Sequence, residues 1–272
     1  MVQIIAEIGI NHNGDIEIAK RLILLAKVAG CDYVKIQKRN PDKCVPEYQK
    51  HKMRDTPWGR MKYIDYKKKI EFSVEEINEL DEYSTTNGIN FFSSIWDLDS
   101  VEVMSAITHI GKIPSALLTN LELCKYARKK FSFLILSTGM SSEEEIEKCV
   151  SVCNPDVIMH TNSTYPCPSN DLNLRYIEYL EQKYPDKDIG YSGHEDGLAT
   201  TFAAVAIGAK WVERHVTINR TMWGSDQSSS IEPPDLIKLV KGIRDIEKAT
   251  KYIPGPRIQF DGELIKRKSL RK

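Results

Sequence analysis

Ionisable side chains of three types stand close together in the stretch WVERHVTINRTMWGSDQ, residues 211–227. Glu213 and His215 are two residues apart, so they share one face if this stretch is a β-strand, and Asp226 follows in a predicted loop. An imidazole beside a carboxylate belongs either to a reactive site or to an ordinary hydrogen-bonded pair. The pair alone does not distinguish the two.

Similar polar residues close seven other β-like runs. In chain order they are Glu7, then Lys35 with Gln37, Ser94, Lys112 with Ser115, Ser137, His160 with Asn162, and Ser192 with His194. Singly, each has an ordinary structural explanation, such as a turn hydroxyl or a lysine whose ammonium reaches solvent. Two lysines on semi-apolar strands, however, would be desolvated without an anionic partner. Together with several hydroxyls, they suit a ligand that carries both phosphate and carboxylate, and two histidines on neighbouring strands suit a divalent transition metal.

These residues need a scaffold that brings strand ends together. Short β-rich runs are predicted at 3–10, 32–37, 90–94, 110–113, 133–137, 156–160, 188–192 and 211–215. Amphipathic helical patterns lie at 15–29, 75–87, 98–108, 120–130, 142–153, 171–183, 196–208 and 234–250. Eight alternating pairs predict a parallel (β/α)8 TIM barrel, with its chemistry at the carboxyl ends of the strands.

An open, doubly wound sheet is the alternative, but no GxGxxG turn follows the first run. We expect residues 1–251 to form the barrel and residues 252–272 a short basic tail. Residues 38–72, rich in Lys, Arg, Tyr and Pro, are predicted to be a long loop, functional or mobile.

The composition narrows the class of protein. Lys plus Arg and Asp plus Glu are both 38, so the chain offers no electrostatic reason to bind nucleic acid or an anionic membrane. The six cysteines form no CxxC pair and are expected to be reduced. No apolar run approaches a membrane span and no basic leader opens the chain, so we expect a soluble cytoplasmic protein.

Several motifs resemble the catalytic barrel of the N-acetylneuraminate (sialic acid) synthase family, whose members condense phosphoenolpyruvate with an N-acetylhexosamine. They are AEIGINHNGD, VKIQ, KIPS, LILSTGMSS, HTNSTYPCP, YSGHEDG, ERHVT and GSDQSSSIEP, in family order over residues 3 to 234. The combination of AEIGINHNG, LSTGM and ERH is far more specific than any one of them.

The resemblance implies a role for each residue. His194 and His215 would hold a divalent ion, Mn²⁺ with Mg²⁺ or Co²⁺ as alternatives. Phosphoenolpyruvate would be cradled by Lys35, Lys112, Ser115, Ser137 and Ser192, with Ser94 at its carboxylate and Ser163 near its phosphate. Glu7 and Gln37 would lie beside the acceptor and the metal, Tyr165 and Asp226 would contact the sugar, and Glu213 would buttress the site. Glu7, Lys35, Gln37 and Lys112 are the predicted catalytic residues.

Two departures fall on the sugar side of the predicted site. Leu117 stands where the family pattern KI-x-S-G-E usually has Glu. The C-terminal antifreeze-like domain of longer members, whose arginine reaches the partner chain's acceptor, is not expected in this sequence. A homodimer would therefore rest on barrel contacts.

The predicted reaction joins phosphoenolpyruvate to an N-acetylhexosamine-like aldehyde such as N-acetylmannosamine. It gives a 2-keto-3-deoxy nonulosonic acid and phosphate. A synthase acting on a phosphorylated aldose, like 3-deoxy-octulosonate 8-phosphate synthase, is one alternative, because the basic 38–72 segment could bind a second phosphate. A non-catalytic sugar-binding paralogue is the other, because of Leu117 and the missing arginine.

Overall fold

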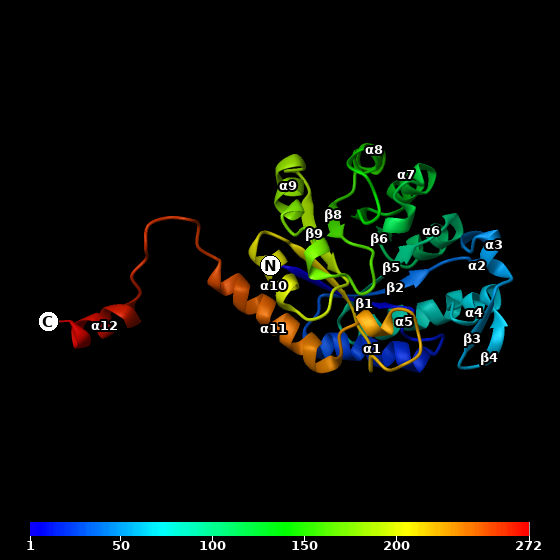
Figure 1. The fold of residues 1–272 in the computed structure, drawn as a ribbon, viewed down its shortest axis with the longest axis horizontal. Coiled ribbons are helices and arrows are strands. Elements are labelled where there is room, and N and C mark those ends of the chain that lie inside the picture. The colour runs from blue at the N-terminus through cyan, green and yellow to red at the C-terminus, as the bar shows by residue number, and fades with distance from the viewer. Residues whose placement is uncertain (272) are drawn as a thin grey trace.

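The computed structural model describes residues 1–271, and eight parallel strands close into a barrel (Figure 1). The barrel strands are β1 (Gln3–Gly9), β2 (Tyr33–Lys38), β5 (Asn90–Ile95), β6 (Ile110–Ile113), β7 (Phe133–Ser137), β8 (Val157–Thr161), β9 (Asp188–Gly193) and β10 (Trp211–His215). They pair in the order β1-β10-β9-β8-β7-β6-β5-β2. The predicted TIM barrel is confirmed and the open sheet is excluded.

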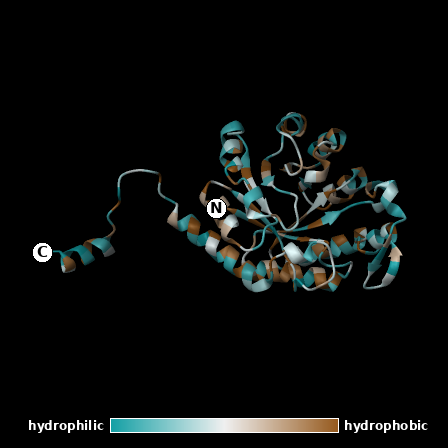
Figure 2. Cartoon of the chain, viewed as in Figure 1, coloured by the Kyte–Doolittle hydropathy of each residue, from teal (hydrophilic) through white to brown (hydrophobic). Residues whose placement is uncertain are grey.

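Helices connect the strands and cover the barrel. They are α1 (Ile16–Ala29), α5 (Val74–Thr86), α6 (Leu98–Ser105), α7 (Leu121–Lys130), α8 (Glu143–Cys153), α9 (Tyr176–Lys183), α10 (Ala199–Ala206) and α11 (Pro233–Ala249). Local signals mark their ends: Ser142 and Glu145 form a capping box at α8, and Gly30 ends α1 with φ 90°. Figure 2 shows apolar and polar residues alternating along these helices, as expected for elements that cover a core on one side.

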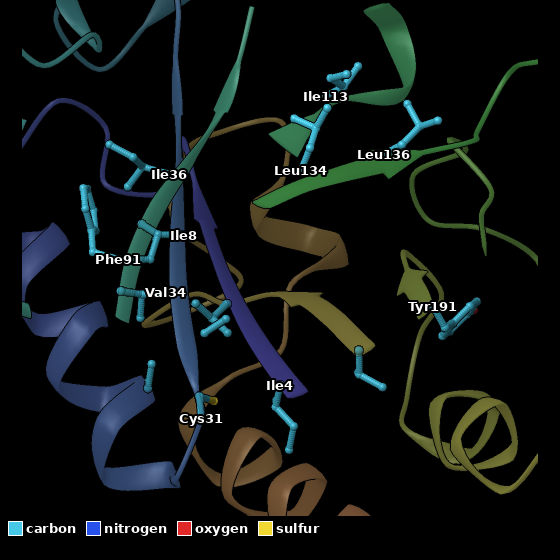
Figure 3. Packing of buried hydrophobic residues seen from close by; sticks show 14 of the residues in the cluster. Ile4, Ile8, Cys31, Val34, Ile36, Phe91, Ile113, Leu134, Leu136 and Tyr191 are labelled. Carbon is cyan, nitrogen blue, oxygen red and sulfur yellow. The ribbon is translucent and has the colours of Figure 1, made fainter. Parts of the chain in front are cut away.

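Side-chain alternation along each strand builds two apolar layers. Residues such as Ile4 and Ile8 of β1 face the helices, and Figure 3 shows them with Val34, Ile36 and Phe91 in this outer layer. The opposite face fills the barrel with Ile5, Phe92, Ile110, Ile135, Val157, Met159 and Trp211. Two residues further along the same strands come Glu7, Ser94, Lys112, Ser137, Thr161 and Glu213. The apolar layer is therefore the floor beneath the polar strand ends.

The segment between β2 and α5 is folded, so the prediction of a long loop at 38–72 is wrong. It contains α2 (Pro41–Cys44), α3 (Glu47–Lys50), an antiparallel hairpin of β3 (Met53–Thr56) and β4 (Gly59–Lys62), and α4 (Tyr63–Lys69). These elements are four to seven residues long. Such lengths are too short to show a clear hydrophobic period, which is why the sequence pattern did not reveal them.

After α11, an exposed segment leads to α12 (Asp261–Leu270), which stands clear of the barrel in Figure 1. The predicted tail thus contains a helix. Within residues 1–271, no helix is long and apolar enough to cross a membrane.

Candidate active site

The carboxyl ends of the barrel strands enclose a polar cavity of about 250 Å³. Its lining includes twelve of the thirteen predicted site residues, namely Glu7, Lys35, Gln37, Ser94, Lys112, Ser115, Ser137, Ser163, Tyr165, Ser192, His194 and His215. Asp226 is the exception: its Oδ2 lies 3.8 Å from His215 Nδ1, but the residue does not line the cavity. Glu213, the predicted buttress, also lines it.

Four buried charges form a compact network in the cavity floor. Lys35 Nζ lies 2.6 Å from Glu7 Oε2, and Lys112 Nζ lies 2.7 Å from Glu213 Oε1. Lys35 Nζ is also 3.7 Å from Glu213 Oε1, which links the two pairs. The strand register explains the first contact, because Glu7 of β1 is level with Lys35 of the neighbouring strand β2. The anionic partners that these buried lysines require are therefore two carboxylates of the protein itself, in addition to any ligand.

The pKa values of the two carboxylates are shifted in opposite directions, because the lysines outweigh burial at only one of them. It raises the pKa of Glu7 to about 7, although Lys35 opposes the shift. Burial acts in the same direction on Glu213, but the ammoniums of Lys112 and Lys35 outweigh it and lower the pKa of Glu213 to about 2. At neutral pH Glu213 is a fixed anion, whereas Glu7 can exchange a proton.

Hydroxyl groups surround the charges. Ser94 Oγ accepts a hydrogen bond from Lys35 Nζ at 2.8 Å, and Ser192 Oγ donates to Glu213 Oε1 at 3.4 Å. Ser115 Oγ accepts from the Gly139 amide at 3.1 Å. Ser137 Oγ is buried and has no hydrogen-bond partner within residues 1–271. A buried hydroxyl without a partner is uncommon and is available to a ligand.

Gly139, of the LSTGM motif, lets two of these hydroxyls approach the backbone. A Cβ at this position would lie 2.3 Å from Ser163 Oγ and 2.9 Å from Ser115 Oγ. Any side chain would therefore displace the serines from this wall of the cavity.

Two imidazoles also line the cavity. The rings of His194 and His215 have centroids 5.3 Å apart. His194 Nδ1 lies 2.7 Å from the Asn162 carbonyl, and the Tyr165 hydroxyl lies 2.9 Å from His194 Nε2. Burial lowers the pKa of His194 to about 3 and also lowers that of His215, so both rings are neutral at pH 7.

The chemistry of these rings fits a divalent transition metal. The Asn162 carbonyl accepts the Nδ1 proton of His194 and leaves Nε2 as a lone-pair donor, the second-sphere arrangement typical of metal-binding histidines. His215 Nδ1 is buried and has no hydrogen-bond partner within the described chain. No group of three or more His, Cys, Asp or Glu in residues 1–271 is placed to hold a metal. An ion would therefore be held by two imidazoles, with its remaining positions open to water and substrate.

His160, counted among the converging strand ends, does not reach the cavity. Its Nε2 lies 2.6 Å from the Leu172 carbonyl, and the next residue, Thr161, lines the cavity instead. The strand ends one residue later than predicted, so the alternation assigns the inner face to Thr161.

The sequence pattern also missed lining residues in the loops after the strands. Trp96, Pro114, Ala116 and Met140 line the cavity. All four are apolar and follow the strand ends, so a search of the sequence for reactive side chains does not identify them. Met140 has φ 64°, a left-handed conformation that follows directly after Gly139.

Comparison with known proteins agrees with this geometry. The model of the NeuB family matches residues 22–253. The chain belongs to the NeuB family. The predicted resemblance is thereby confirmed, because NeuB relatives include synthases of sialic-type acids.

Two relatives show the range of the family. Human N-acetylneuraminate-9-phosphate synthase is 38% identical over 90% of this chain and 70% of its own length. The N,N'-diacetyllegionaminic acid synthase of Campylobacter jejuni is 35% identical over 90% of this chain and 76% of its own. Among solved structures, the sialic acid synthetase of Leptospira borgpetersenii in complex with citrate superposes with a TM-score of 0.87 and 34% identity, covering 100% of this chain and 93% of that one.

Proposed function

We propose that this NeuB-family barrel condenses phosphoenolpyruvate with an N-acetylhexosamine-like aldehyde, such as N-acetylmannosamine, to give a 2-keto-3-deoxy nonulosonic acid and phosphate. The observation that carries the proposal is the juxtaposition, in one cavity, of Lys35 and Lys112 with a pair of neutral imidazoles. The synthases among its relatives support the reaction class.

The cavity suits the enolpyruvyl anion on its lysine side. Lys35, Lys112 and the serines present cationic and hydroxyl donors to the carboxylate and phosphate, and the unpartnered Ser137 Oγ adds one more. The carboxylates of Glu7 and Glu213 keep both ammoniums in place before the substrate arrives. Donors that are already oriented need little reorganisation when charge develops in the reaction.

The reaction forms one carbon–carbon bond. C3 of phosphoenolpyruvate attacks the aldehyde carbon with the electron pair of its C2–C3 double bond, and the aldehyde oxygen takes up a proton. Water adds to C2 and loses a proton, and phosphate departs with cleavage of the C2–O bond. Glu7, with a pKa of about 7, can donate or accept a proton beside both centres.

His194 and His215 would hold the divalent ion, with Mn²⁺ proposed. When bound, the ion supplies Lewis-acid polarisation of the acceptor carbonyl. Tyr165, whose hydroxyl contacts His194, and Gln37, which donates to Glu7 at 3.1 Å, would orient the acceptor.

Product analysis tests the proposal. Purified protein, Mn²⁺, phosphoenolpyruvate and N-acetylmannosamine should release phosphate in proportion to a nine-carbon keto acid seen by mass spectrometry. Activity with arabinose 5-phosphate and none with N-acetylmannosamine, unphosphorylated or 6-phosphorylated, would favour an octulosonate-type synthase instead. Binding of sugar without phosphate release from any acceptor would favour the non-catalytic paralogue.

A further inference from the structure

A buried ion pair lies behind the two histidines, on the outer face of the barrel strands. Arg214 of β10 and Glu195, which follows β9, are each 1% exposed, and Arg214 Nη1 lies 3.2 Å from Glu195 Oε1. Each is the neighbour in sequence of one candidate metal ligand, since Glu195 follows His194 and Arg214 precedes His215. The proposed reaction uses neither of these charges.

The guanidinium of Arg214 holds the connection between β9 and α10, which begins at His194. Its Nη2 donates to the Glu195 carbonyl at 2.6 Å. Its Nη1 donates to the Gly197 carbonyl at 2.9 Å and to Thr201 Oγ1 at 2.8 Å. Because the guanidinium is a planar fork of fixed geometry, these contacts restrain the backbone of the connection to one position relative to β10.

The Glu195 carboxylate is held on its other sides as well. Its Oε1 accepts hydrogen bonds from Thr200 Oγ1 at 2.7 Å and Thr201 Oγ1 at 3.0 Å, both in α10. Its Oε2 accepts from the hydroxyl of Tyr191 at 2.8 Å, and Figure 3 shows Tyr191 in the outer layer of the barrel. The carboxylate therefore joins the strand that precedes His194 to the helix that follows it.

Gly193 leaves the space that this carboxylate occupies. It is level with Arg214 in the strand register. A Cβ at this position would lie 2.6 Å from Glu195 Oε2 and 2.8 Å from Tyr191 Cε1. Any other residue at position 193 would therefore displace the carboxylate. The glycine is an independent sign that this part of the chain is built around the ion pair.

Stability alone does not account for the pair. Transfer of two charges out of water costs about as much as their attraction contributes, so apolar residues of similar volume often give an equally stable fold. Apolar residues, however, cannot hold a carbonyl and a carboxylate in fixed positions through hydrogen bonds. On the inner face of the same strand ends, the rings of His194 and His215 have centroids 5.3 Å apart. The pair on the outer face thus fixes the backbone beside each ring.

We propose that Arg214 and Glu195 are positioning residues that fix the separation of the His194 and His215 imidazoles, and so set the affinity of the site for a divalent ion. The proposal rests on the proposed function, since it concerns the metal role assigned there to the histidines. The pair acts through the backbone and touches neither metal nor substrate. It holds the two strand ends together before an ion binds, so that binding requires less reorganisation of the rings.

The affinity for Mn²⁺ tests this role without reference to turnover. Electron paramagnetic resonance of the free ion measures it, below the unfolding temperature of each variant. Arg214→Met should weaken Mn²⁺ binding about tenfold, because the connection that begins at His194 loses its attachment to β10. The sign of the change is diagnostic. Loss of a nearby positive charge would by electrostatics alone strengthen the binding of a cation, so weaker binding identifies positioning.

Gly193→Ala is a second test, and it changes no charge. Its Cβ should displace the Glu195 carboxylate and weaken Mn²⁺ binding in the same direction as Arg214→Met. It removes neither charge of the pair, so it tests the role even where Arg214→Met does not fold. Arg214→Lys keeps the positive charge but not the fork, and it should recover only part of the affinity that Arg214→Met loses.

Arg244→Met is the matched control. Arg244 also binds a carboxylate and a backbone carbonyl, Asp32 Oδ2 at 2.8 Å and the Val2 carbonyl at 2.7 Å. Val2 and Asp32 precede β1 and β2, so these contacts lie at the amino ends of the strands, whereas the histidines lie at the carboxyl ends. Arg244→Met should lower stability and leave the affinity for Mn²⁺ within about twofold of the wild type.

Phosphate release at saturating Mn²⁺ separates this proposal from the proposed function. In Arg214→Met the KM for phosphoenolpyruvate should stay within about twofold of the wild type, because Lys35 and Lys112 are unchanged. Unchanged or stronger Mn²⁺ binding in Arg214→Met and Gly193→Ala would overturn the positioning role and leave the reaction standing. Mn²⁺ binding that depends on Arg214, without phosphate release from any acceptor, would refute the reaction and keep the positioning role. A wild type that binds no Mn²⁺ would overturn the positioning role together with the metal role.

Discussion

Lys112 Nζ on β6 lies 2.7 Å from Glu213 Oε1 on β10, and this contact crosses the interior of the barrel. The ammonium of Lys112, which is proposed to bind the substrate anion, is therefore already paired with a carboxylate before any substrate binds. The lysine has two separable roles, since it neutralises a buried carboxylate in the fold and would bind phosphoenolpyruvate in the reaction. A pair of variants can separate them.

Lys112→Met should destabilise the protein by roughly 3 kcal/mol, because the buried carboxylate of Glu213 would keep only the more distant ammonium of Lys35. Adding Glu213→Gln should recover most of that loss. In the single and the double variant alike, phosphoenolpyruvate should bind roughly 10- to 100-fold more weakly than in the wild type, because the charge-assisted contact from Lys112 is lost. Chemical denaturation and calorimetry measure the two quantities. Lys130→Met removes an exposed ion pair with Glu102 and is the control. It should change neither the stability nor the affinity for phosphoenolpyruvate.

The barrel and most of the cavity were predictable from sequence, because both depend on the short hydrophobic repeats of strands and helices. All eight strands lie within two residues of their predicted positions, and alternation by two placed Glu7, Lys35 and Lys112 on one face. The charge pairing was not predictable. It depends on contacts such as Lys112–Glu213 between strands that are 101 residues apart in sequence.

A hollow of about 660 Å³ beside residues 39–46, Tyr63 and Lys67 shows a different limit of prediction from sequence. Its outer wall includes residues of α2 and α4, which are four and seven residues long and leave no clear periodic signal. Composition indicated that residues 38–72 are basic. Only the folded arrangement distinguishes Lys67, which is buried and unpaired, from Lys68, which is exposed and paired.

Ser137→Ala should separate stability from binding. Because Ser137 Oγ is buried without a partner, its removal should leave stability unchanged or raise it by up to about 1 kcal/mol. The KM for phosphoenolpyruvate should rise roughly tenfold, since the hydroxyl would hydrogen-bond the substrate. Ser94→Ala is the contrast, because Ser94 Oγ accepts from Lys35 and its loss should cost about 1 kcal/mol of stability. Loss of stability in Ser137→Ala with unchanged KM would refute this assignment.

His215→Ala should weaken Mn²⁺ binding at least about tenfold, because one of two imidazole ligands is lost. Electron paramagnetic resonance of free Mn²⁺ measures the affinity without reference to turnover. Removal of metal with a chelator should abolish phosphate release in the wild type, and added Mn²⁺ should restore it. His109→Ala, at an exposed histidine, is the control. Full Mn²⁺ affinity and full activity in His215→Ala would rule out the metal role.

The buried charge of Lys67 should be visible in the pH dependence of stability. Its pKa is about 8 in the folded protein against 10.5 as the ordinary value. Between these values the unfolded chain binds more protons, so the free energy of unfolding should rise with pH, by about 3 kcal/mol in total. Below pH 8 the full destabilisation is present. Lys67→Met should therefore be the more stable protein at pH 7, and the advantage should disappear by about pH 10.5.

Urea denaturation of the wild type and of Lys67→Met between pH 7 and 10 measures the difference in their free energies of unfolding. Titratable groups that both proteins share contribute equally and cancel when one free energy is subtracted from the other. Lys68→Met should show no such trend, because its ammonium is half-exposed. A wild-type protein that is as stable as Lys67→Met across this range would show that the ammonium is hydrated through the hollow rather than held unpaired.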